Sequence, residues 1–195
     1  MRTTIKIAIA EDHELLRKGL VSIFEAEECI DVVFEASNGL EVFDTLKDCP
    51  IDILLLDLDM PVMNGVEVMR KLKVQCPEIK SVILSMHYSP DFILECLSVG
   101  AVGFLAKNTN VENIMEALES VHKFGFYVCK DNSMNFLENE MKKRDLSLPK
   151  EISSSIFKVL CSGTPFHHIA KDYEIPEEQI IKIWDMFLSD LKKSR

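Results

Sequence analysis

The chain has 195 residues, of which 47% are hydrophobic and 28% are charged, and its formal net charge at pH 7 is −10. This composition is typical of a globular protein and excludes a disordered chain. The length fits one ordinary domain with a small second domain, and such an acidic chain does not attract nucleic acid or an anionic membrane through its overall field.

The cysteines and the amino-terminal segment set further limits. The six cysteines are scattered, with no Cys-x-x-Cys pair and no histidine at metal-ligand spacing. We therefore expect reduced thiols, most of them buried, instead of a zinc site or disulfides. The first apolar run meets two acids at once and is too short for a signal peptide, and no stretch approaches the ~18 apolar residues of a membrane span. The sequence thus predicts a cytoplasmic protein without a membrane segment.

Strands and helices are expected to alternate along the first two thirds of the chain. Short aliphatic runs bounded by turn residues predict strands buried on both faces, and apolar positions at helical spacing predict the helices. The expected strands are Ile5–Ala10, Ile30–Ala36, Ile51–Leu56, Ile79–Leu84 and Val102–Ala106. The expected helices lie near residues 13–26, 40–46, 66–74, 89–100 and 111–123. This alternation predicts an α/β fold in which a five-stranded parallel sheet is doubly wound, with helices on both faces.

Polar residues stand at the carboxyl ends of four of these strands. Glu11 and Asp12 follow the first strand, and Asp57 follows the third. Ser85 follows the fourth strand and Lys107 the fifth. Because ligands bind beyond the carboxyl ends of the strands in open α/β sheets, we expect these side chains to converge on one rim.

The expected cluster has the chemistry of phosphoryl transfer. Three carboxylates brought close together repel one another, so positive charge is needed between them. Lys107 supplies one charge, and Mg²⁺, a hard ion that prefers oxygen ligands, is the natural remainder. Asp57 can then stay ionised and attack phosphorus, while Ser85 donates a hydrogen bond to the phosphoryl group. Each residue alone has an ordinary explanation, such as acids at a helix start, but their joint placement favours a functional site.

The stretches that carry these residues resemble a known family. They are IAIAEDHELLRKGL, ILLLDLDMPVMNG, SVILSMH, GAVGFLAK and the helix VENIMEALESVHKFGFYV. Together they resemble the receiver domain of two-component response regulators, close to the NarL/FixJ type. The resemblance covers residues 1–128 and implies a flavodoxin-like receiver fold.

The resemblance implies a role for each acid. Asp57 is the implied phospho-acceptor, and a phosphohistidine on a partner histidine kinase is the implied donor. Glu11 and Asp12 are the acidic pair, with Asp12 as a direct ligand of Mg²⁺. Asp57 and the backbone carbonyl of Asp59 complete the implied metal ligands.

The resemblance also implies residues that respond to the phosphoryl group. Ser85 and Phe104 stand at the two switch positions, and Lys107 matches the family's lysine. The side chains of Asp59 and His87 are implied to tune the rate of dephosphorylation. For Phe104 a plain core aromatic is the alternative, and for His87 a plain surface residue.

The last third of the chain has a different pattern. Residues 129–147 are polar and charged, which predicts a linker, either a flexible tether or a docking helix. Helices are expected over 149–162, after Thr164-Pro165, and over a third segment with a clear apolar stripe. The stripe consists of Ile180, Trp184, Phe187, Leu188 and Leu191. Residues 148–195 therefore resemble, in layout, a small all-α helix-turn-helix domain of the LuxR type.

The surface of the third helix departs from that resemblance. Phosphate contacts need lysine and arginine, yet residues 145–195 carry seven Lys/Arg against eight Asp/Glu. The positions implied to face DNA hold Gln179, Ile181, Lys182 and Asp185. Exposed isoleucines suit a protein contact better than a groove of DNA. The sequence thus separates the helix-turn-helix fold from the DNA-binding activity.

Three functions remain as hypotheses. The first is a transcriptional regulator that is switched by phosphorylation of Asp57, which the resemblance implies either frees the recognition helix or promotes dimerisation. The second is a receiver whose degenerate tail binds a protein and no DNA. The third is a Mg²⁺-dependent phosphatase with an aspartyl intermediate and Asp59 as general acid, but the receiver spacing of Ser85, Phe104 and Lys107 argues against it. We expect no enzyme activity beyond self-phosphorylation from small donors and self-dephosphorylation.

Overall fold

The computed structural model describes residues 4–86, 92–93, 96, 99–127, 166–176, 178–180 and 182. The chain divides into two compact units, Met1–Gly125 and Phe126–Arg195. Among the described residues, no helix is long and apolar enough to span a bilayer. The linker expected over 129–147 and the helix expected over 149–162 lie outside the described residues.

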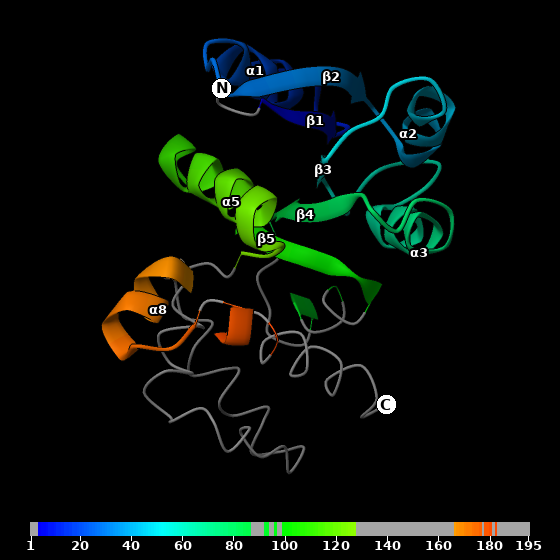
Figure 1. Ribbon diagram of the computed structural model, residues 1–195. Helices are drawn as coiled ribbons and strands as arrows, with labels where there is room; N and C mark the ends of the chain where they lie inside the picture. Colours follow the sequence, from blue (N-terminus) through cyan, green and yellow to red (C-terminus); the bar gives the residue numbers. More distant parts are fainter. Residues whose placement is uncertain are drawn as a thin grey trace. The chain divides into compact units, whose positions relative to one another are not determined.

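The first unit is built on a parallel sheet of five strands (Figure 1). The strands are β1 (Ile5–Ala10), β2 (Ile30–Ala36), β3 (Ile53–Leu56), β4 (Lys80–Ser85) and β5 (Ala101–Ala106). Their order is β2-β1-β3-β4-β5, and every pair of neighbours is parallel. The predicted doubly wound sheet is confirmed: the bounds of β1 and β2 are as expected, and those of β3, β4 and β5 differ by one or two residues.

Helices cover both faces of this sheet. The described helices are α1 (Glu14–Glu25), α2 (Gly39–Leu46), α3 (Gly65–Gln75) and α5 (Val111–Phe124). In Figure 1, α1 and α5 lie to one side of the strands and α2 and α3 to the other. Within the helix expected over 89–100, the described residues 92, 93, 96 and 99 are helical, and residue 100 is in a turn.

The core follows from the alternation of side chains along buried strands. Leu54, Leu56 and Ile83 pack into one cluster with residues of α2 and α3, such as Val42 and Met69. The alternate positions of β3, Ile53 and Leu55, are equally buried, and α1 and α5 contact the strands next to them. Strands with both faces covered need aliphatic residues throughout, which explains the continuous apolar runs.

Side chains of asparagine begin three of the helices. Asn38 accepts hydrogen bonds from the N–H groups of the first turn of α2, and Asn110 does the same for α5. Asn64 and Glu67 form a reciprocal capping box at the start of α3. This capping box fixes where α3 begins after the loop that follows β3.

The second unit contains α8 (Phe166–Tyr173), which coincides with the second helix expected in the tail. Ile169 in this helix is fully buried. Residues 178–180 and 182 of the expected third helix are helical, and Ile180 is buried.

Candidate functional site

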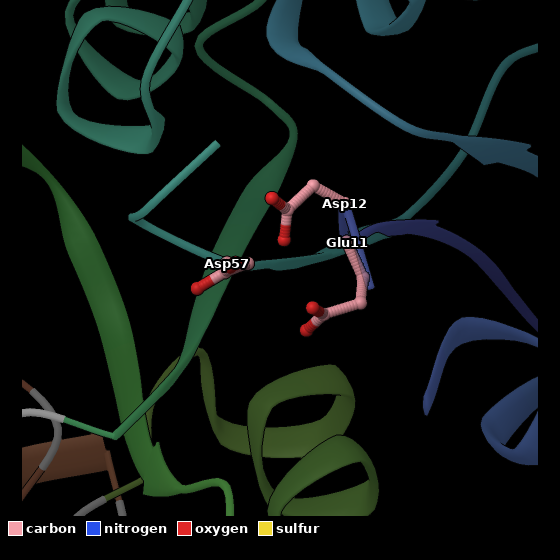
Figure 2. Close-up of side chains that lie close together, drawn as sticks. All are labelled: Glu11, Asp12 and Asp57. Atoms are coloured by element: carbon pink, nitrogen blue, oxygen red, sulfur yellow. The ribbon is translucent and has the colours of Figure 1, made fainter. Parts of the chain in front are cut away.

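The register of the sheet brings the acids at the ends of β1 and β3 together (Figure 2). The N–H of Asp57 donates to the carbonyl of Ala10 over 2.8 Å, and the N–H of Glu11 donates to the carbonyl of Ala36 over 3.0 Å. One carboxylate oxygen from each of Glu11, Asp12 and Asp57 lies within 4.8 Å of the others. The predicted convergence of these three acids on one rim is what the structure contains.

The three acids differ in their exposure to solvent. Glu11 and Asp57 are 1% and 2% exposed, whereas Asp12 is exposed. Two buried carboxylates side by side are unfavourable unless positive charge compensates them. The site therefore needs a cation that reaches both buried acids.

Lys107 provides that charge from the end of β5. Its Nζ lies 2.9 Å and 2.8 Å from Oε1 and Oε2 of Glu11, and 2.9 Å from Oδ2 of Asp57. The N–H of Lys107 donates to the carbonyl of Ser85 over 2.9 Å, which continues the pairing of β4 with β5. Lys107 thus bridges two carboxylates that come from two different strands.

Burial and ion pairing act in opposite directions on the pKa values of Glu11 and Lys107. Burial raises the pKa of Glu11, and the charge of Asp57 adds to this, while the hydrogen bond and charge of Lys107 act in the opposite direction. Burial lowers the pKa of Lys107, but its close pairing with the carboxylates of Glu11 and Asp57 outweighs burial and raises that pKa overall. Lys107 therefore stays charged near neutral pH.

The donor set fits a hard divalent cation. Within the described part of the chain, Oε2 of Glu11 and Oδ2 of Asp57 accept no hydrogen bond of good geometry, although both are buried and lie at ion-pair distance from Lys107. Carboxylate oxygens with spare acceptor capacity, next to an exposed third carboxylate, are the ligands that Mg²⁺ prefers. Asp12 is the acid that solvent can reach.

The other predicted site residues take different places. The N–H of Asp59 donates to Oδ1 of Asp57 over 3.3 Å, so Asp59 stands at the edge of the same site. Ser85 is the last residue of β4 and is fully buried. Phe104 is buried in β5 and packs edge-on against Phe92, with ring centroids 6.4 Å apart. The ring of Phe104 belongs to the core cluster of the first unit.

The predicted residues of the tail are only partly described. Gln179 and Lys182 are helical and exposed. Ile181 and Asp185 lie outside the described residues, and so does His87 in the first unit.

Two residues beside the site were missed by sequence reasoning. Arg17 donates to the backbone carbonyl of Glu11 over 2.6 Å, and a Cβ at Gly65 would lie 2.4 Å from the carbonyl oxygen of Asp57. Both contacts depend on how the backbone folds back on itself, which no residue spacing encodes. The only available signal was that Gly65 closes the turn after Asp57.

The loop between Asp57 and α3 holds one backbone outlier. Val62 has a φ of 69°, a left-handed conformation that is rare for a β-branched residue, and its side chain is 76% exposed. We expect Val62→Asn to raise the free energy of unfolding by about 1 kcal/mol, because asparagine tolerates this conformation. Urea unfolding monitored by circular dichroism measures the change.

Val74 offers a matched control for that substitution. It is equally exposed, at 82%, but lies in α3. Because valine and asparagine have similar helix propensities, Val74→Asn is expected to give no gain in stability. A gain of the same size in both variants would show that the backbone of Val62 is not strained.

Comparisons with known proteins agree with this geometry. The family profile of the response regulator receiver domain matches residues 7–119. The transcriptional regulatory protein LnrK of Bacillus subtilis is 33% identical over 148 residues, which cover 76% of this chain and 67% of LnrK. The profile and this name describe regulators, which agrees with the expectation of a protein that is not an enzyme and gives no support to a phosphatase.

Solved structures share the fold. A LuxR-family two-component response regulator from Aurantimonas sp. SI85-9A1 is similar with a TM-score of 0.66 and 24% identity, covering 72% of this chain and 99% of that one. A complex of the two-component response regulator RcsB with DNA is similar with a TM-score of 0.65 and 23% identity, covering 98% of this chain and 90% of that one. Both likenesses concern the fold.

Proposed function

Since this chain belongs to the response regulator receiver family, we propose that it accepts a phosphoryl group on Asp57 from a phosphohistidine of a partner histidine kinase. The observation that carries this proposal is the position of Lys107, whose Nζ lies within 2.9 Å of both Glu11 and Asp57 beside a third carboxylate. This arrangement places a nucleophilic carboxylate next to the charges that a phosphoryl group requires.

The transfer uses Asp57 as a nucleophile. One carboxylate oxygen attacks phosphorus, the bond from phosphorus to the imidazole nitrogen of the donor breaks, and the electron pair leaves with the imidazole, which takes a proton. Lys107 Nζ pairs with a phosphoryl oxygen as charge spreads over these oxygens. The hydroxyl of Ser85 donates a hydrogen bond to the bound phosphoryl group.

Mg²⁺ is the cofactor in this proposal. Asp12, Asp57 and the backbone carbonyl of Asp59 would hold it, with Glu11 as the second member of the acidic pair. When bound, the ion supplies charge neutralisation for the phosphoryl oxygens. Asp59 and His87 would tune the later loss of the phosphoryl group. Ser85 and Phe104 would re-pack towards it and so change the receiver face around β4 and the helix that follows β4.

Removal of the metal tests this proposal. The full chain is incubated with acetyl phosphate, with either Mg²⁺ or excess EDTA, and intact mass is followed over time. We expect the mass to increase by one phosphoryl group with Mg²⁺ and to stay unchanged with EDTA. Uptake at the same rate in both samples would contradict a metal-assisted site.

We further propose that the tail is the output domain of a transcriptional regulator in the cytoplasm. In this scheme residues 1–128 are the receiver, 129–147 the linker and 148–195 the helix-turn-helix-like domain. The name of LnrK and the RcsB–DNA complex support the proposal. Phosphorylation would promote a homodimer, which sums the contacts of two half-sites and offsets the small number of basic residues.

Selection from a random duplex library tests the output. The chain phosphorylated with acetyl phosphate is expected to enrich one sequence family, and binding should weaken steeply as salt increases. The unphosphorylated chain is the control. If neither form binds DNA at low salt, the alternative stands, in which the acidic third helix contacts a protein partner through Ile181, Ile183 and Met186.

A further inference from the structure

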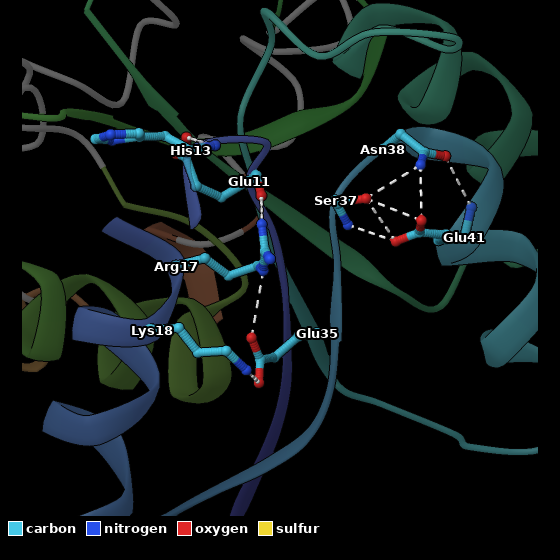
Figure 3. A network of polar contacts seen from close by, with 8 residues as sticks. All are labelled: Glu11, His13, Arg17, Lys18, Glu35, Ser37, Asn38 and Glu41. Carbon is cyan, nitrogen blue, oxygen red and sulfur yellow. Dashed lines mark hydrogen bonds and ion pairs between the residues drawn. The ribbon is translucent and has the colours of Figure 1, made fainter. Parts of the chain in front are cut away.

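Arg17 joins three elements beside the acidic cluster (Figure 3). It lies in the first turn of α1, and its side chain is 13% exposed. Nη1 donates to the backbone carbonyl of Glu11 over 2.6 Å, just after β1. Nε donates to Oε2 of Glu35 in β2 over 3.3 Å. One guanidinium group therefore ties α1 and β2 to the segment that carries the acids.

The other polar groups of Glu11 also have partners. Its N–H donates to the carbonyl of Ala36 over 3.0 Å, and its Oε1 accepts from the N–H of His13 over 3.1 Å. Its carboxylate is paired with Lys107. The carbonyl of Glu11 is the remaining polar group, and Arg17 fixes it.

That carbonyl belongs to the peptide unit that leads into Asp12. A peptide unit is planar, so a bond that fixes the carbonyl of Glu11 also fixes the N–H and Cα of Asp12. The Cα from which the exposed Asp12 carboxylate extends is therefore held in place. The hydrogen bond from Arg17 also turns the carbonyl oxygen of Glu11 towards α1. The carboxylates are then the oxygens that face a cation.

We propose that Arg17 is a positioning residue for the Mg²⁺ site, an inference that rests on the proposed function. Arg17 touches none of the carboxylates of the site and acts through the peptide between Glu11 and Asp12. A guanidinium group suits this task because its planar fork serves two acceptors at once and stays charged. A lysine at this position has one ammonium group for two acceptors that lie on different elements.

Glu35 anchors Arg17 and also provides a control. Its Oε1 accepts from Nζ of Lys18 over 2.7 Å. Lys18 is 58% exposed and makes no contact with Glu11 among the described residues. Substitution of Lys18 therefore removes a charge from the same acid, one residue from Arg17, without freeing the carbonyl of Glu11.

The experiment compares Arg17→Gln, Arg17→Lys and Lys18→Gln in the full chain. Titration calorimetry gives the Kd of Mg²⁺ for each. Loss of a partner that orients a metal ligand typically weakens metal binding about 10- to 100-fold, so we expect Arg17→Gln to raise the Kd about 10-fold. Arg17→Lys should weaken binding as well, because it keeps the charge but loses the fork. Lys18→Gln should bind Mg²⁺ as the unmodified chain does.

A second readout separates positioning from general stability. The Mg²⁺ concentration that gives half-maximal phosphoryl uptake from acetyl phosphate should rise by the same factor in Arg17→Gln. The rate at saturating Mg²⁺ should be retained, because Asp57 and Lys107 are unchanged. Unfolding midpoints without metal show whether each variant is folded at the temperature of the titration.

The outcomes are distinct. If the unmodified chain binds no Mg²⁺, the proposed function itself is contradicted. If it binds Mg²⁺ and the folded Arg17 variants bind equally well, Arg17 is merely structural and the inference is overturned. If Arg17→Gln does not fold, Arg17→Lys, which keeps the aliphatic stem and the charge, decides by the same criteria.

Discussion

Asp57→Asn is expected to reduce phosphoryl uptake from acetyl phosphate to below about one hundredth of the unmodified rate. The amide that replaces the carboxylate carries no charge and is a poor nucleophile towards phosphorus. It also removes one of the oxygens proposed to hold Mg²⁺. Intact mass spectrometry after incubation with Mg²⁺ measures the uptake.

The same substitution should leave the fold intact. Asparagine has nearly the same shape as aspartate, and the buried pair that remains, Glu11 and Lys107, is balanced in charge. Because the charge of Asp57 contributes to the raised pKa of Glu11, its removal should lower that pKa. We therefore expect the unfolding midpoint without metal to be unchanged or higher, which separates loss of uptake from loss of structure.

The pH dependence gives an independent check of that argument. The pKa of Glu11 is raised above its usual value of 4.5. Between pH 4.5 and the raised pKa, the folded chain therefore binds a proton that the unfolded chain has released. Without metal, the contribution of Glu11 to stability is present below pH 4.5 and is lost as the pH rises through the raised pKa. In Asp57→Asn this loss should be smaller.

Asp52→Asn serves as the control for Asp57→Asn. Asp52 precedes β3, at the opposite end of the strand from Asp57, and accepts a hydrogen bond from the N–H of Lys6. Phosphoryl uptake should persist in this variant. Uptake that persists equally in Asp57→Asn would mean that another residue accepts the phosphoryl group.

Gly65→Ala is expected to lower the free energy of unfolding by about 2–3 kcal/mol. A Cβ at this position would lie 2.4 Å from the carbonyl oxygen of Asp57 and 2.8 Å from Cα of Leu58. Both neighbours are backbone atoms, and the N–H of Gly65 also donates to the carbonyl of Leu58 over 3.0 Å. The start of α3 or the residue that carries the acceptor carboxylate must therefore move. Urea unfolding measures the loss.

Gly19 provides the matched glycine. It lies within α1, and a Cβ there would meet no atom within 4 Å. Gly19→Ala should therefore raise the free energy of unfolding by up to about 1 kcal/mol, through helix propensity alone. If both substitutions changed stability in the same direction and by the same amount, close packing at Gly65 would not be the cause.

Much of the receiver sheet was predictable because each buried strand needs a continuous aliphatic run. The bounds shifted where side chains compete with the backbone ladder. β3 begins at Ile53 and not at Ile51, and the side chain of Asp52 accepts from the N–H of Lys6. α2 begins at Gly39 because Asn38 caps it. The order of the strands needs pairing information that a single sequence does not carry.

The candidate site was predictable in part for the same reason. Parallel strands end at one rim, so the acids after β1 and β3 and the lysine after β5 had to converge. Residue spacing does not predict the hydrogen bond from Arg17 to Glu11 or the close approach of Gly65 to Asp57, because both depend on three-dimensional packing. The left-handed backbone of Val62 could not be predicted either, because valine is typical of strands.

The most direct test of the central claim is to locate the phosphoryl group on the chain. After incubation with acetyl phosphate and Mg²⁺, borohydride reduces an acyl phosphate to an alcohol, and peptide mass spectrometry finds the altered residue. We predict a single altered position, with Asp57 converted to homoserine and no conversion when EDTA is present. Conversion of Asp12, Asp59 or any other acid, with Asp57 intact, would contradict the assignment of Asp57 as the phospho-acceptor.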